Sequence, residues 1–163
     1  MHDKACFNVS GFFQPTAFFL VAGAGDASHA LIAFDRALLA AGVGDVNLVK
    51  LSSIVGPRCI RVEPLSLVPG SLVPAAYAWI TCDQPRQRIA SAVAVAHPAD
   101  PSRASLVTEH SAVASKNEVE EIVIAMAEEG MVSRGLKVAR IDSIGIEHTV
   151  ERVGATFAGV VEV

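Results

Sequence analysis

Two adjacent serines, Ser52 and Ser53, end an apolar stretch in the segment DVNLVKLSSIVGP. A serine hydroxyl held against the preceding peptide bond can attack its carbonyl carbon and convert the amide into an ester. β-Elimination then leaves dehydroalanine, which hydrolyses to a pyruvoyl group. This chemistry needs a hydroxyl, a distorted backbone and a hydrogen-bond donor for the oxyanion. The pair indicates either such self-processing or, more simply, serines that cap a turn.

Asn47 is a candidate for the oxyanion donor. It precedes Ser53 by six residues on the strand predicted over residues 45–52. An even separation along a strand places two side chains on the same face of the sheet. The spacing therefore predicts that the Asn47 amide lies on the side of Ser53.

Two carboxylates lie among apolar residues. Asp35 has helical spacing to Leu31 and Leu38, so it projects from the apolar stripe of a predicted helix. A carboxylate there costs stability unless it is paired, either with a cation of this chain or with a cationic ligand. Glu109 follows Val107 in a predicted strand. Burial would let it hold a proton near neutral pH, whereas the alternative is an exposed strand glutamate.

Composition and the remaining motifs exclude several classes of function. The net charge of -4 gives no basic surface for nucleic acid. The three cysteines, Cys6, Cys59 and Cys82, and the five histidines show no metal-ligand spacing, so no metal is expected. GAGDAS lacks the third glycine of a dinucleotide motif, because Ser28 stands there, and it predicts a tight turn instead. No segment has the length of a membrane span or the pattern of a signal peptide, so we expect a cytoplasmic protein.

Hydrophobic periodicity predicts the elements that must position these residues. Ser115 and Glu118 form a capping box at the start of the second helix. Its apolar face is predicted to be Val119, Ile122, Met126 and Met131, and that of the first helix Leu31, Phe34, Leu38 and Ala41. Strands are predicted over 16–23, 45–52, 75–82, 88–98, 104–113, 137–150 and 155–163, helices over 28–41 and 115–133, and an irregular connection over 60–75. Helices packed outside sheets give an α+β sandwich.

Five segments together resemble the pyruvoyl-dependent arginine decarboxylases: FFLVAGAG, FDRALLAAGVGDVNLVKLSSI, PGSLVPAAYAWI, ASAVAVAHP and DSIGIEHTVERVGATFA. The resemblance extends from about Pro15 to near the end of the chain. It implies a four-layer αββα sandwich of antiparallel or mixed sheets with two main helices, in one domain over residues 1–163. It also implies cleavage between Ser52 and Ser53 into a β chain, residues 1–52, and an α chain, residues 53–163.

The resemblance also implies roles for individual residues. Ser53 becomes the covalent pyruvoyl cofactor, which forms a Schiff base with L-arginine on the way to agmatine and CO2. Asn47 assists processing, and Glu109 is the catalytic acid. Asp35, Leu38 and Asn47 bind the substrate, with Asp35 at its guanidinium group. The expected assembly is a homotrimer with each active site between neighbouring subunits, and two trimers could pair further.

Two alternatives remain open at the level of sequence. The first is a pyruvoyl decarboxylase for another basic amino acid, since Asp35 would also attract lysine or ornithine. The second is a relative that does not process itself and serves as a trimeric scaffold or small-molecule binding module.

Overall fold

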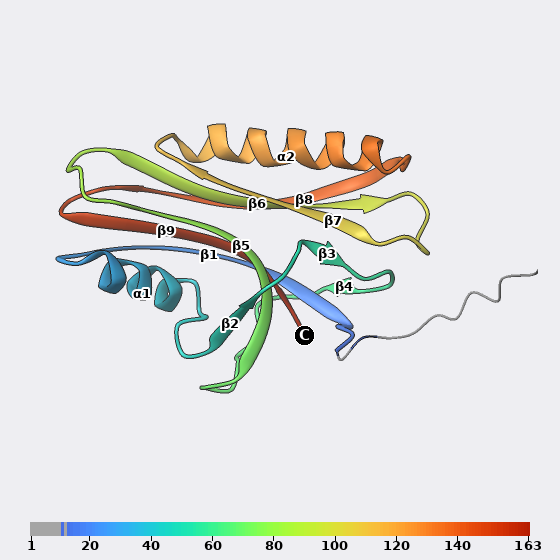
Figure 1. The fold of residues 1–163 in the computed structure, drawn as a ribbon, viewed down its shortest axis with the longest axis horizontal. Coiled ribbons are helices and arrows are strands. Elements are labelled where there is room, and N and C mark those ends of the chain that lie inside the picture. Colours follow the sequence, from blue (N-terminus) through green and yellow to red (C-terminus); the bar gives the residue numbers. More distant parts are fainter. Residues whose placement is uncertain (1–10, 12) are drawn as a thin grey trace, which may run out of the picture.

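The two helices cover the outer faces of two stacked β-sheets (Figure 1). The computed structural model describes residue 11 and residues 13–163. The helices are α1 (Ala30–Ala40) and α2 (Lys116–Ser133). The strands are β1 (Ala17–Ala27), β2 (Asn47–Lys50), β3 (Ile54–Val55), β4 (Ile60–Arg61), β5 (Leu72–Cys82), β6 (Arg88–Pro98), β7 (Ser105–Ala112), β8 (Val138–Thr149) and β9 (Val153–Glu162). The predicted αββα order of layers is confirmed.

Strand pairing distinguishes the two sheets. The first has the order β2-β5-β9-β1-β4 and is mixed, because β2 runs parallel to β5 and β4 parallel to β1. The second has the order β3-β7-β6-β8 and is antiparallel throughout. In both sheets the central strands, β9 and β6, are almost wholly buried. Such strands are covered on both faces and read as near-continuous apolar runs.

The alternation in β6 shows how sequence divides the core. Val93 and Val95 face the other sheet, whereas the alanines between and around them pack under α2. Side chains on one strand alternate between the two faces. The small alanine side chains let α2 approach the sheet closely, and the larger valines fill the space between the sheets.

The GAGDA segment is not the predicted turn, because β1 continues through it to Ala27. Its glycines instead leave room for α1 to pack against β1. A Cβ atom at Gly23 would collide with the backbone of Ala37, and one at Gly25 would lie 2.5 Å from Cβ of Arg36. The close approach of a helix to a strand therefore requires glycine at both positions.

The predicted helix faces are right in part. In α1, Phe34, Leu38 and Ala41 pack against the core as predicted, but Leu31 is 75% exposed and the fully buried positions are Ala33 and Ala37. Alanines make the closest contact with the sheet because α1 lies so close to the glycines of β1. In α2 the capping box is confirmed. Its buried face is Val119, Val123, Ala127 and Met131, whereas Ile122 and Met126 are 39% and 42% exposed.

Strand bounds around the prolines also differ from expectation. The connection predicted as irregular contains β4, and β5 begins at Leu72 rather than at Ala75. Pro74 is tolerated inside β5 at the register position opposite Val49 of β2. The strand predicted over 45–52 is shorter, since β2 covers only Asn47–Lys50.

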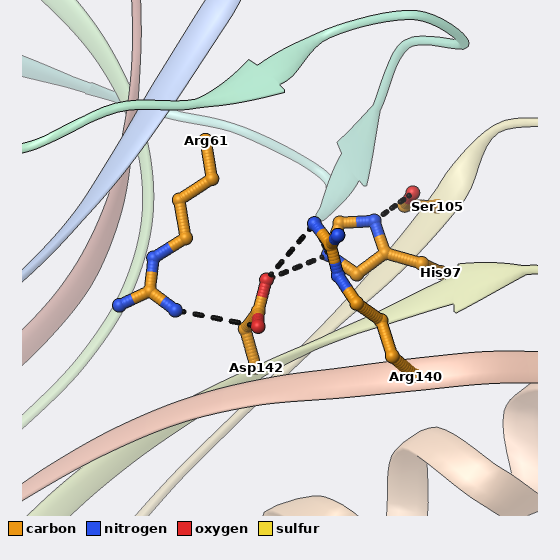
Figure 2. A network of polar contacts seen from close by, with 5 residues as sticks. All are labelled: Arg61, His97, Ser105, Arg140 and Asp142. Atoms are coloured by element: carbon orange, nitrogen blue, oxygen red, sulfur yellow. Dashed lines mark hydrogen bonds and ion pairs between the residues drawn. The ribbon is translucent and has the colours of Figure 1, made fainter.

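A polar cluster joins the two sheets at the end that carries β4 (Figure 2). Asp142 on β8 accepts from Nε2 of His97 at 3.0 Å and pairs with Nη1 of Arg61 at 3.3 Å. Arg140 reaches the same carboxylate at 3.4 Å, and Ser105 lies 3.1 Å from Nδ1 of His97. Burial lowers the pKa of His97, although its hydrogen bond to Asp142 acts in the opposite direction. The imidazole is therefore neutral at pH 7 and serves as a structural link.

Residues 11 and 13–163 contain no helix long and apolar enough to cross a membrane. Within the same part of the chain no cluster of histidine, cysteine and carboxylate residues could hold a metal ion. Cys59 and Cys82 are free thiols. Cys6 and the N-terminal segment lie outside the described residues.

Candidate active site

The serine pair lies where the chain crosses from one sheet to the other. β2 ends at Lys50 on the edge of the five-stranded sheet, and β3 begins at Ile54 on the edge of the four-stranded sheet. Figure 1 shows this crossover beside the end of β5. Because both strands are edge strands, a break in the crossover leaves β2 paired with β5 and β3 paired with β7.

The crossover is fixed at both ends and distorted between them. The Leu51 N–H donates to the Ala75 carbonyl at 2.9 Å, and the Ser53 carbonyl accepts from Val107 N–H at 2.9 Å. Ser53 itself has a φ of 71°, in the left-handed region. A residue other than glycine in this conformation costs of order 1–3 kcal/mol and persists only where the surroundings impose it. The distorted backbone expected for self-processing is therefore present at the second serine.

Glu109 on β7 accepts the hydroxyl hydrogen of Ser53. The distance from Ser53 Oγ to Glu109 Oε2 is 2.8 Å, and the glutamate side chain is 22% exposed. The family resemblance placed Ser53 and Glu109 in one active site, and in the structure the two side chains are in direct contact. The hydroxyl has a carboxylate in position to take its proton.

Lys50 completes the arrangement, and the sequence analysis missed it. Its Nζ lies 2.7 Å from Glu109 Oε1 and 4.4 Å from the centre of the Tyr77 ring, and it also donates to the Tyr77 carbonyl. The Glu109 side chain therefore contacts both the Ser53 hydroxyl and the Lys50 ammonium group, one through each carboxylate oxygen. The available signal was a lysine two residues before the serine pair, at the end of β2.

Asn47 lies away from the serine pair within this chain. It is exposed at the start of β2, and its Nδ2 donates to the Gly70 carbonyl at 3.1 Å. Alternation would place the two side chains on one face only if the strand continued through Ser53, but β2 ends at Lys50. Among the described residues no hydrogen bond connects Asn47 with Ser53.

Asp35 and Leu38 lie on α1, in a different layer from Glu109. Asp35 is exposed and has no ion-pair or hydrogen-bond partner within residues 13–163, so the internal ion pair considered from the sequence is not seen. Leu38 is half-buried against the core under α1. Since α1 packs on β1, β9 and β5, a single protomer places Asp35 and Glu109 on different layers.

Comparison with known proteins gives the same family over nearly the whole chain. The family model described as pyruvoyl-dependent arginine decarboxylase (PvlArgDC) matches residues 17–161. The protein of that name from Methanocaldococcus jannaschii is 45% identical over 148 residues, covering 90% of this chain and 89% of its own. The one from Methanococcus aeolicus is 44% identical over 161 residues, covering 98% and 97%.

More distant relatives extend the comparison. The pyruvoyl-dependent arginine decarboxylase of Pyrococcus abyssi is 37% identical over 150 residues, covering 90% of this chain and 94% of its own. Among solved structures, a pyruvoyl-dependent histidine decarboxylase at pH 8 aligns with 57% of this chain and 51% of its own, with a TM-score of 0.48 and 16% identity. On the sequence matches, this chain belongs to the pyruvoyl-dependent arginine decarboxylase family.

Proposed function

We propose that this chain is a self-processing decarboxylase that converts L-arginine to agmatine and CO2, with a pyruvoyl group derived from Ser53. The observation that carries the proposal is the hydrogen bond from Ser53 to Glu109 at a left-handed residue. It supplies a nucleophile, a base and a strained backbone at one peptide bond. The family membership supplies the substrate class.

The described residues supply the nucleophile and the base for the cleavage. Glu109 accepts the proton of Ser53 Oγ as this oxygen bonds to the carbonyl carbon of Ser52. The C–N bond between the serines breaks, the nitrogen takes up a proton, and an ester remains. Loss of the Cα proton and rupture of the Cβ–Oγ bond then release residues 1–52 with a terminal carboxylate. Water finally displaces the nitrogen as ammonia.

The residues around Ser53 also fit the group that this sequence of steps creates. The pyruvoyl carbonyl supplies the electron sink that decarboxylation needs. Glu109, already within hydrogen-bond distance of the residue 53 side chain, is placed to deliver a proton to the α-carbon of the substrate. Lys50 holds that carboxylate in place through the ion pair at 2.7 Å.

We assign Asp35 and Leu38 to the substrate site of a neighbouring subunit. Asp35 is free of other partners in the described chain, and its planar carboxylate matches a guanidinium group. Leu31, Ile32 and Leu39 are 75%, 46% and 51% exposed around it, an apolar surface suited to a subunit contact. This supports the proposed homotrimer, with Asn47 as a further contact to substrate or cleavage site, and leaves pairing of trimers open.

The location that we propose for this reaction is the cytoplasm. Cys59 and Cys82 are free thiols, as is usual in a reducing compartment.

Intact mass after purification tests the proposal. The expected result is two polypeptides: one ends at Ser52, and the other begins at residue 53 with a ketone in place of the amino group. A single polypeptide near 17.0 kDa that retains the Ser53 hydroxyl would instead favour the non-processing scaffold or binding module. CO2 release from arginine, lysine and ornithine then separates the candidate substrates. Release from lysine or ornithine but not arginine would overturn the assignment of the substrate.

A further inference from the structure

A second carboxyl group, Glu162 on β9, is buried without a partner. Its residue is 3% exposed, and Oε1 has no hydrogen bond within the described chain. Val160 of the same strand belongs to the core between the sheets, and an even separation places Glu162 on that same face. An unpaired buried carboxyl group costs stability, so it calls for a compensating partner.

This carboxyl group lies in the wall of an apolar cavity. The cavity has a volume of about 590 Å³ and is lined by the aliphatic side chains of Val49, Leu51, Ile54 and Pro74 among others. Glu162 is the one charged side chain among its described lining residues. The volume lies within the range of sites for small molecules.

The cavity is separate from the Ser53–Glu109 site, although both use the same segment of chain. Lys50 and Ser53 direct their polar groups to Glu109. Val49, Leu51 and Ser52 line the cavity instead. Neither Asp35 nor Glu109 belongs to the cavity wall. The two sites therefore share the crossover segment, but their charged side chains differ.

The chemistry of the wall defines the ligand. Aliphatic side chains suit a chain of methylene groups, and a buried carboxylate suits one positive charge. We propose that this cavity binds an alkyl cation, an aliphatic ammonium or guanidinium ion, with Glu162 as its counter-ion. The assignment goes beyond the proposed decarboxylation and does not depend on it.

The protonation of Glu162 gives the proposal a characteristic pH dependence. Burial raises the pKa of Glu162 to about 7. Cys59 is the titratable group found beside it, and the pKa of that thiol is raised by burial and then by the Glu162 charge. A cation binds the ionised carboxylate, so affinity should rise as the pH rises through the pKa of Glu162. An uncharged ligand should show no such rise.

The test uses the full chain carrying Ser53→Ala and Asp35→Ala. The first change leaves no carbonyl for amines to react with, and the second removes the proposed guanidinium site. Isothermal titration with butylguanidine, butylamine and 1-butanol then reports on the cavity. We expect both cations to bind more tightly than butanol, and more tightly at about pH 8 than at about pH 6.

Adding Glu162→Gln should weaken cation binding by about 10- to 100-fold, the value of a charge-assisted hydrogen bond. Adding Glu63→Gln, which alters an exposed carboxylate outside the cavity, should change nothing. If Glu162→Gln does not fold, Val49→Trp at the rim blocks the cavity at a residue that is 43% exposed. Equal binding of butanol and cations, or undiminished cation binding by both variants, would overturn the proposal. Neither result would bear on cleavage at Ser53.

Discussion

The hydroxyl of Ser53 lies 2.8 Å from Oε2 of Glu109, and the two residues are 56 positions apart in the chain. The contact is made by the serine hydroxyl, the group that the proposed processing reaction consumes. In the function that we propose, this one carboxylate serves first the nucleophile of the processing reaction and then the protonation of the substrate. This double position links the two reactions that we assign to the site.

Replacing Ser53 by alanine should leave one uncleaved and inactive chain, because the attacking oxygen is gone. Ser52→Ala is the matched control: it keeps the carbonyl that is attacked and removes only the neighbouring hydroxyl. We expect the control to cleave. Intact mass and a denaturing gel measure both. Cleavage of the Ser53→Ala chain would show that another nucleophile acts.

Glu109→Gln keeps the shape and a hydrogen-bond acceptor but cannot take up a proton. General acid–base catalysis contributes typically 10²–10⁴-fold, so cleavage and decarboxylation should each slow by about 10²-fold or more. Gel densitometry gives the first rate, and CO2 release per cleaved chain gives the second. Glu121→Gln, on the exposed side of α2, should leave both unchanged. Normal rates in the Glu109 variant would remove it from the mechanism.

Lys50→Met removes the ammonium group that lies 2.7 Å from Glu109. The carboxylate then loses its partner and its fixed orientation, so cleavage should slow by about 10-fold or more. Lys50→Arg keeps a positive charge and should restore part of the rate, which a purely structural role would not explain. Lys116→Met, which breaks a half-buried pair at 3.9 Å away from the site, is the control and should have no effect. Unaltered cleavage in Lys50→Met argues against a positioning role.

Asp35→Ala should weaken arginine binding while self-cleavage proceeds normally. A hydrogen bond to a charged group contributes about 1.5–3 kcal/mol, so KM should rise by roughly 10- to 100-fold. Asp45→Ala, another exposed aspartate, serves as the control. Steady-state kinetics on fully cleaved protein measure the effect. An unchanged KM would place the guanidinium group elsewhere.

The buried Glu162 should make stability depend on pH. Its pKa is raised from 4.5 to about 7 in the folded chain. The folded state therefore keeps a proton that the unfolded state loses, and this stabilising contribution is complete below pH 4.5 and lost as the pH rises to about 7.

Glu162→Gln removes that dependence. Relative to the unaltered chain, the variant should gain on the order of 2–3 kcal/mol in free energy of unfolding between about pH 5 and about pH 8. Urea unfolding at the two pH values measures the gain, and Glu121→Gln should give none. If the free energy of unfolding depended on pH equally in the unaltered and Glu162→Gln chains, the pKa of Glu162 would not be raised by folding.

The sequence was sufficient for features that depend on neighbours a few positions away. Strand alternation predicted β6, and the Ser115–Glu118 box predicted the start of α2. The serine pair and its chemistry were also visible, because they occupy adjacent positions. Propensity, capping and periodicity act over short separations, so a single chain reveals them.

The tertiary structure determined everything that depended on contacts between distant segments. Lys50 and Glu109 are 59 positions apart and meet only because β2 and β7 border the same crossover. The most deeply buried positions of α1 and α2 include Ala33, Ala37 and Ala127, because small residues allow each helix to lie close to its sheet. Glu162 reads as an ordinary strand-end glutamate, yet two stacked sheets bury it. Local patterns cannot encode such burial, since it results from which surfaces meet when the whole chain folds.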